Sequence, residues 1–448
     1  MAQLRSNQPS AMGAFVQSAG AKLLIIALNA ATGILTARAL APAGRGELSA
    51  MILWYVFLAS VFSLGLPTAI TYRLRMQPDQ ASELSAAALM FSVVISVFAI
   101  AVGFFGLPYL IPQYSPQVLF FARIFLWNTP IIVFVVMGRA ALESQGNFTA
   151  SNLSLIAQPL LTLGGLLLLL WTHTFTAINA AWCYVLSGLP PLVGMLRCFF
   201  RTFKPHFSQL RRSASLLLSY GIRSYGIDLC GTLSLYVDQA LVIRILQPSL
   251  MGTYVVALSL SRMLNVFHTA IAMVLFPRAV SRTPREVLEL TGRSVRMTTF
   301  IAAFCGAGIM IAGPRLLILL YGREYGGAAA ILRILVIEVV LAGATQVMSQ
   351  AFMALSRPGV VTTLQAIGLL LTIPLMLVLV PRFGIEGAAL SLLLSTCARF
   401  AFVLASFSLF LDLPRPAVLP RRADLSFLLS ALARRLRALQ PSVVGGEA

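Results

Sequence analysis

Charged residues are scarce in this sequence. Only 10% of its 448 residues are Asp, Glu, Lys or Arg, whereas 58% are apolar. A water-solvated fold of this length carries far more charge on its surface, so the composition places the chain in a lipid bilayer. The basic residues outnumber the acidic ones, 33 against 14, but they lie mostly between hydrophobic runs. This pattern indicates membrane topology rather than nucleic-acid binding.

Residues that serve metal or nucleotide chemistry are equally scarce. None of the three histidines lies near a cysteine or an acidic cluster, so we expect no metal site. The five cysteines lack CxxC and CxxxC spacing, which indicates neither a disulfide framework nor a zinc site. The sequence contains no GKS or GKT phosphate-binding loop. We therefore expect neither ATP-driven transport nor a cofactor, apart from H⁺ or Na⁺ as a coupling ion.

What the sequence has in abundance is long hydrophobic runs. Runs of about twenty apolar residues predict an all-α polytopic membrane protein with about twelve transmembrane helices. Most connections are short and contain Pro or Gly, as expected between antiparallel helices. The predicted spans lie near residues 14–40, 47–72, 84–111, 117–142, 149–171, 175–200, 214–245, 250–277, 296–320, 327–354, 360–381 and 385–411.

The distribution of Lys and Arg predicts the orientation. The connections after even-numbered spans carry 14 of these residues, and those after odd-numbered spans carry 8. Six more follow residue 411. The positive-inside rule therefore places both termini in the cytoplasm, as expected for an inner-membrane protein. Within the tail, the amphipathic segment 424–439 is expected either to lie on anionic headgroups or to be solvated.

An internal repeat divides the chain into two halves. The pattern Arg38-x-Leu40-x-Pro42-x-x-x-Gly46 returns 206 residues later as Arg244-x-Leu246-x-Pro248-x-x-x-Gly252. Six spans per repeat give both halves the same orientation, which predicts two six-helix lobes about a cleft, as in transporters. We expect an N-terminal lobe over 1–201, a basic cytoplasmic linker over 202–213, a C-terminal lobe over 214–411 and a basic cytoplasmic tail over 412–448.

Four segments are distinctive: Ala-Arg-Ala-Leu-Ala-Pro-Ala-Gly-Arg-Gly-Glu-Leu at 37–48, Ala-Leu-Glu-Ser-Gln-Gly-Asn-Phe at 141–148, Tyr-Gly-Arg-Glu-Tyr at 321–325 and Phe-Gly-Ile-Glu-Gly-Ala-Ala at 383–389. They resemble segments of oligosaccharide flippases of the Wzx type, which handle O-antigen and capsular precursors. The chain departs from the family at Ala41 and Ala43, where Gly and Glu are common. The resemblance implies the multidrug/oligosaccharidyl-lipid/polysaccharide exporter superfamily. It also implies a V-shaped fold like that of multidrug and toxin extrusion (MATE) exporters, with alternating access.

Ionisable residues inside spans point to the cargo, because each costs about 2.5 to 3.5 kcal/mol to insert and usually faces a wet cavity or a partner. Five are basic and three acidic, which favours an anionic cargo such as a polyprenyl-pyrophosphate-linked glycan. We expect a cationic cleft lined by Arg223, Arg262, Arg123 and Arg333. The alternative for Arg123 and Arg399 is snorkelling to headgroups. The three acidic residues, Asp228, Asp238 and Glu338, are the candidates for ion coupling.

The seventh predicted span carries a polar stripe. Tyr220, Ser224, Asp228, Gly231, Leu235 and Asp238 recur at helical steps and share one face. A carboxylate on this face could bind Na⁺ or carry a proton, or it could simply pair with Arg223 or Arg262. The repeat offset also makes Lys22 equivalent to Asp228. This suggests a gate between the two, the alternative being a positive-inside anchor at Lys22.

These features predict a non-enzymatic flippase that moves a lipid-linked, anionic oligosaccharide across the inner membrane, coupled to H⁺ or Na⁺. A MATE-type multidrug exporter is the first alternative, but a cationic drug favours an acidic, aromatic cavity. A membrane glycosyltransferase or polymerase is less favoured, because such enzymes need a long extracytoplasmic loop, and every predicted outward loop is short. Expected partners are membrane lipids and a polysaccharide polymerase or export machinery.

Overall fold

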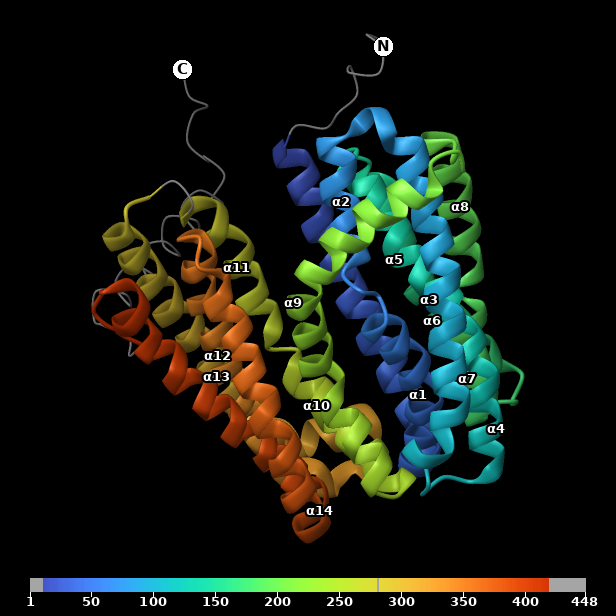
Figure 1. Cartoon of the computed structure of the whole chain (residues 1–448). Coiled ribbons are helices and arrows are strands. Elements are labelled where there is room, and N and C mark those ends of the chain that lie inside the picture. Colours follow the sequence, from blue (N-terminus) through green and yellow to red (C-terminus); the bar gives the residue numbers. More distant parts are fainter. Residues whose placement is uncertain (1–10, 280–281, 419–448) are drawn as a thin grey trace, which may run out of the picture. The chain divides into compact units, whose positions relative to one another are not determined.

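The computed structural model describes residues 11–279 and 282–418 (Figure 1). Within these ranges the regular structure is helical, and no residue lies in a strand. The helices are α1 (Ala11–Val61), α2 (Leu66–Met76), η1 (Pro78–Gln80), α3 (Ala81–Leu110), α4 (Pro116–Phe125), η2 (Leu126–Asn128), α5 (Thr129–Ser144), α6 (Phe148–Trp171), α7 (Ala177–Leu186), α8 (Leu189–Phe203), α9 (Leu210–Ile245), α10 (Pro248–Arg262), α11 (Asn265–Ala279), α12 (Pro284–Tyr321), η3 (Arg323–Ala328), α13 (Ala329–Ala354) and α14 (Pro358–Leu411).

The number of spans agrees with the sequence. Among the described residues, 8 helical stretches are long and apolar enough to cross a membrane, or up to 10 when each bent pair counts as one span. Two of these stretches, in α1 and α14, each join two helices across a bend, at Ala41 and at Gly384. Counting each as two spans gives about twelve, and the chain is a multi-pass membrane protein.

Local sequence explains where the helices bend and begin. Ala41 leaves helical geometry with φ 56° directly before Pro42, whose ring removes a backbone donor. Gly384, with φ 57°, makes the bend in α14 without a Cβ penalty. The hydroxyl of Ser115 accepts a hydrogen bond from the Val118 amide at 3.3 Å and caps the start of α4. The Asn147 side chain caps α6 in the same way.

The described residues form two compact units. The first runs to Leu260 and includes 312–332 and 369–392, and the second comprises 261–311, 333–368 and 393–418. A core of buried side chains that includes Leu66, Ile70 and Phe199 lies inside the first unit. Another core, which includes Val295, Met348 and Phe407, lies inside the second. The lobe and linker boundaries predicted from the repeat stay a prediction, and the tail beyond residue 418 lies outside the described residues.

The second predicted span, 47–72, is broken rather than continuous. The helix stops at Val61 and restarts at Leu66, and Leu64 and Gly65 between them both have positive φ. Helix α9 packs against this turn, because a Cβ at Gly65 would lie only 2.4 Å from the carbonyl oxygen of Gly221. The Tyr225 hydroxyl also donates to the carbonyl of Val61. The break therefore brings the start of α2 against the middle of α9.

Candidate functional site

Three cavities inside the first unit surround the contact between α2, α5 and α9. We call them the central cavity (about 400 Å³), the tyrosine cavity (about 540 Å³) and the arginine cavity (about 500 Å³). Pro67 and Thr68 line both the central and the tyrosine cavity. Ile132 and Val136 line both the central and the arginine cavity. The central cavity thus shares lining residues with each of the other two, and α5 contributes to all three.

The central cavity contains Asp228, one of the predicted ion-coupling residues. The Thr68 hydroxyl donates a hydrogen bond to Oδ2 of Asp228 at 3.1 Å. Asp228 is the one ionisable residue among the lining side chains, and Ser60, Ser63 and Thr232 add hydroxyl oxygens. A carboxylate surrounded by hydroxyls is a set of oxygen ligands suited to a hard cation or a proton. Asp228 thus lies where an ion could reach it.

The tyrosine cavity has an aromatic wall and two opposite charges. Tyr72 and Tyr220 stack with ring centroids 4.3 Å apart and planes inclined by 8°. The guanidinium carbon of Arg73 lies 5.9 Å from each centroid, within cation–π range. Arg75 and Glu143 line the same cavity. Tyr72 is 40% exposed, so its ring is accessible to a ligand.

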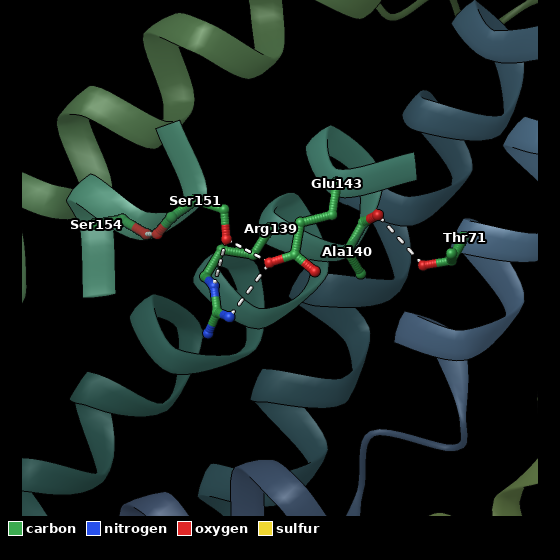
Figure 2. Close-up of polar contacts among 6 residues, drawn as sticks. All are labelled: Thr71, Arg139, Ala140, Glu143, Ser151 and Ser154. Atoms are coloured by element: carbon green, nitrogen blue, oxygen red, sulfur yellow. Dashed lines mark hydrogen bonds and ion pairs between the residues drawn. The ribbon is translucent and has the colours of Figure 1, made fainter. Parts of the chain in front are cut away.

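A polar network on α5 and α6 includes one residue of the tyrosine cavity and one of the arginine cavity (Figure 2). Arg139 on α5 donates from Nε to the Ser151 hydroxyl at 3.1 Å and from Nη2 to Oε1 of Glu143 at 3.3 Å. The Ser151 hydroxyl donates to the same carboxylate oxygen. Arg139 lines the arginine cavity, whereas Glu143 lines the tyrosine cavity. One ion pair on a single helical turn therefore contributes a charge to each hollow.

The same helical turn is held from two neighbouring helices. The Thr71 hydroxyl on α2 donates to the carbonyl of Ala140 at 3.2 Å, and Ser151 on α6 contacts Arg139 and Glu143. Within α6, the Ser154 hydroxyl donates to the carbonyl of Ser151 at 2.8 Å. Asn29, Gln158 and Tyr184 also line the arginine cavity. Amides, hydroxyls and a guanidinium can hydrogen-bond a hydroxyl-rich, anionic ligand, and aromatic faces can stack on its apolar parts.

A second polar cluster is buried inside the second unit. Glu338, predicted as an ion-coupling residue, accepts a hydrogen bond from the Thr396 hydroxyl at 2.7 Å. Arg399 donates to the same hydroxyl at 2.7 Å, and its Nη2 lies 4.0 Å from Oε1 of Glu338. Gly368 leaves space for the side chain of Arg399, because a Cβ at Gly368 would lie 2.4 Å from Cδ of Arg399. Arg399 is thus held by a buried partner rather than extended towards headgroups.

Two other predicted site residues have structural partners. Arg123 donates from Nε to the carbonyl of Phe104 at 3.2 Å, and its guanidinium carbon lies 4.6 Å from the Phe104 ring centroid. Asp238 is 1% exposed and accepts a hydrogen bond from the Tyr254 hydroxyl at 2.9 Å. These contacts tie α4 to α3 and α10 to α9. The predicted roles in cargo binding and ion coupling stay predictions.

The remaining predicted site residues, all basic, differ in how exposed their side chains are. Arg223 and Lys22, in the first unit, are exposed. Arg333 is exposed and Arg262 half-buried, both in the second unit. The cationic cleft and the gate between Lys22 and Asp228 stay predictions, and the partner that the structure gives Asp228 is Thr68.

The sequence interpretation missed Arg139 and Tyr72 as site residues, whereas Tyr220 belongs to the predicted polar stripe. A usable signal existed for Arg139, because Arg139 and Glu143 are four residues apart on a helix, and Glu143 belongs to a segment that resembles the flippases. No comparable signal marks Tyr72, since its stacking on Tyr220 depends on the break between α1 and α2.

The sequence is similar to those of known proteins. A family model described as polysaccharide biosynthesis protein matches residues 35–330. A probable low-salt glycan biosynthesis flippase, Agl15 of Haloferax volcanii, is 25% identical over 196 residues. That match covers 43% of this chain and 41% of the relative, so the matched region spans about two fifths of the relative's length. The family resemblance inferred from the four segments is confirmed.

Solved structures show the same fold. The lipid II flippase MurJ in an inward closed conformation superposes with a TM-score of 0.77 at 13% identity, covering 96% of this chain and 94% of MurJ. An inward-facing MATE multidrug resistance transporter of the MOP superfamily gives 0.68 at 16% identity, covering 86% and 95%. At these identities the likeness shows the fold alone. It confirms the predicted fold class, an all-α polytopic membrane protein.

Proposed function

Because the chain belongs to the family of polysaccharide biosynthesis proteins, we propose that it is a flippase for a lipid-linked, anionic oligosaccharide. It acts as a transporter rather than an enzyme, by alternating access, in the inner membrane with both termini in the cytoplasm. The orientation rests on the excess of Lys and Arg after even-numbered spans. A polysaccharide polymerase or export machinery is the proposed partner that receives the translocated glycan.

The observation that carries this proposal is the chemistry of the three cavities in the first unit. Their walls combine a stacked tyrosine pair, the arginines Arg75 and Arg139, and many hydroxyls. Sugars present hydroxyls and flat apolar ring faces, and phosphate or uronate groups present negative charge. Guanidinium groups bind such anions bidentately, while hydroxyls and amides form hydrogen bonds with the hydroxyl groups of the sugar. The walls therefore suit a glycan better than a purely apolar drug.

We propose Asp228 as the residue that couples transport to an ion gradient. Its carboxylate opens onto a cavity of about 400 Å³ with three hydroxyl-bearing neighbours besides Thr68. A Na⁺ ion or a proton bound there would change the charge of α9 during the transport cycle. Glu338 is a weaker candidate, because Thr396 and Arg399 already engage its carboxylate inside the second unit.

A MATE-type multidrug exporter is the second candidate, favoured by the fold it shares with such transporters and by the aromatic wall at Tyr72. Binding to the purified protein separates the two. We expect a fluorescent polyprenyl-pyrophosphate oligosaccharide to bind, and this binding to weaken in Tyr72→Ala and Arg75→Ala variants. Binding of a cationic dye in the absence of glycolipid binding would support the multidrug exporter and contradict the proposal.

A further inference from the structure

A basic cleft of about 740 Å³ lies in the second unit, apart from the cavities described above. It is formed by the first turns of α12 and by the segment 414–417 that follows α14. Its lining carries four arginines, Arg282, Arg293, Arg296 and Arg415, against two carboxylates, Glu286 and Glu289. We propose that this cleft binds the headgroup of an anionic phospholipid, a site independent of cargo transport.

The charges converge because they share one face of a helix. Glu286, Glu289, Arg293 and Arg296 recur at steps of three and four residues along α12, so their side chains lie on the same side. One carboxylate is already engaged, since Oε2 of Glu286 accepts from the amide of Thr283 at 2.9 Å and from its hydroxyl at 3.0 Å. The bond from the Thr283 amide to Glu286 is one half of a capping box and helps to fix the start of the helix.

The other wall of the cleft is held in place by the end of α14. Asp412 adopts a left-handed conformation with φ 52° and ends the helix, and the chain then returns over α12. Pro416 is buried beside Gly292, and Val418 packs against the core of the second unit. Nη1 of Arg296 donates to the carbonyl of Ala417 at 3.5 Å. Arg415 is thereby presented on an anchored segment.

The length of α12 places the membrane-proximal part of the cleft at the depth of the lipid headgroups. A helix of 38 residues such as α12 is about 57 Å long, whereas the hydrocarbon core is about 30 Å thick. Residues 297–314 contain no charged residue and suit the hydrocarbon core. Arg293 and Arg296, within about one turn of this run, therefore project into the interface. The proposed orientation faces them towards the cytoplasmic leaflet, whose lipids carry negative charge.

The lining also fits the rest of a phospholipid. Leu288 and Leu290 line the cleft beside the arginines. The apolar run 297–314 begins directly after Arg296, so the acyl chains of a bound lipid can enter the hydrocarbon core there, while the guanidinium groups bind the phosphate. A soluble phosphate ester shares only the second of these features. We therefore assign the cleft to a lipid rather than to a free phosphate.

The test measures retention of lipid by the full chain. Protein is released from nanodiscs that contain equal amounts of phosphatidylglycerol and phosphatidylcholine, and bound lipids are counted by native mass spectrometry. We expect a preference for phosphatidylglycerol that falls about fivefold for each arginine removed, in Arg415→Ala and in the double variant Arg282→Ala/Arg415→Ala. Arg323→Ala, in η3, removes the same charge on the predicted opposite side and is the matched control.

Three results would overturn the proposal. Equal retention of the two lipids by the wild-type protein means that the cleft has no headgroup preference. If Arg323→Ala lowers the preference for phosphatidylglycerol as much as Arg415→Ala does, the preference reflects the overall charge of the protein. Displacement of phosphatidylglycerol by millimolar glycerol 3-phosphate means that the cleft is a soluble-phosphate site. The charge-reversed variant Arg415→Glu supplies an independent check, because it should lose the preference more completely than Arg415→Ala.

Discussion

Gly46 and Gly252 each face the backbone of the other copy of the repeated motif. A Cβ at Gly46 would lie 1.8 Å from the carbonyl oxygen of Pro248, and a Cβ at Gly252 would lie 1.9 Å from the carbonyl oxygen of Pro42. The two contacts are reciprocal, as expected for segments related by a twofold axis. The sequence repeat is thus reflected in a physical contact, and only glycine permits the backbones to approach this closely.

Substitution of either glycine tests this contact. We expect Gly46→Ala and Gly252→Ala each to destabilise the protein by about 1 to 3 kcal/mol or more, because the added methyl group must displace backbone rather than a flexible side chain. Thermal unfolding in detergent measures the change. Gly33→Ala is the matched control, since its Cβ would meet nothing within 4 Å. Equal stability of Gly46→Ala and Gly33→Ala would contradict the close approach.

The buried cluster in the second unit predicts strong coupling between Glu338 and Arg399. Removal of one partner leaves a buried charge, so we expect Arg399→Met and Glu338→Gln each to lower the free energy of unfolding by about 3 to 5 kcal/mol. The free energy of unfolding should fall by less in the double variant than the sum of the two single decreases. A double-mutant cycle on thermal stability measures this difference, and strict additivity would show that the two side chains do not interact.

Glu143 is predicted to matter more for transport than for stability. Its ion pair with Arg139 is partly exposed, with side-chain accessibilities of 26% and 36% for Arg139 and Glu143, so its loss should change stability by less than about 1 kcal/mol. The carboxylate nevertheless lines the tyrosine cavity. We expect Glu143→Gln to fold normally and to transport poorly. The control Asp79→Asn, at an exposed carboxylate, should change neither stability nor transport. Unfolding of Glu143→Gln at lower temperature would instead indicate a structural role.

Substitution of Asp228 should affect ion coupling and leave cargo binding unchanged. We expect Asp228→Asn to bind glycolipid as the wild type does but to lose the stimulation of transport by an imposed H⁺ or Na⁺ gradient, because the amide carries no charge. Thr68→Val removes the hydrogen bond and keeps the carboxylate, so it should retain gradient dependence. Gradient-driven transport by Asp228→Asn would exclude this residue as the coupling site.

The sequence predicted the helices far better than the side-chain contacts. Hydrophobic length and the Pro and Gly positions predicted the spans, because the membrane requires long apolar helices. The turn between Val61 and Leu66 lies inside an apolar run, and its signals are Gly65 and Pro67. That turn sets the position of Thr68, so the bond from Thr68 to Asp228 could not be foreseen from helical spacing within α9 alone.

Translocation of a lipid-linked glycan tests the central claim most directly. The assay follows a fluorescent polyprenyl-pyrophosphate oligosaccharide in proteoliposomes and compares the wild type with Arg223→Ala and Arg262→Ala, alongside efflux of a cationic dye. The account predicts glycolipid translocation by the wild type, slower translocation by the arginine variants and no dye efflux. Dye efflux without glycolipid movement would contradict it.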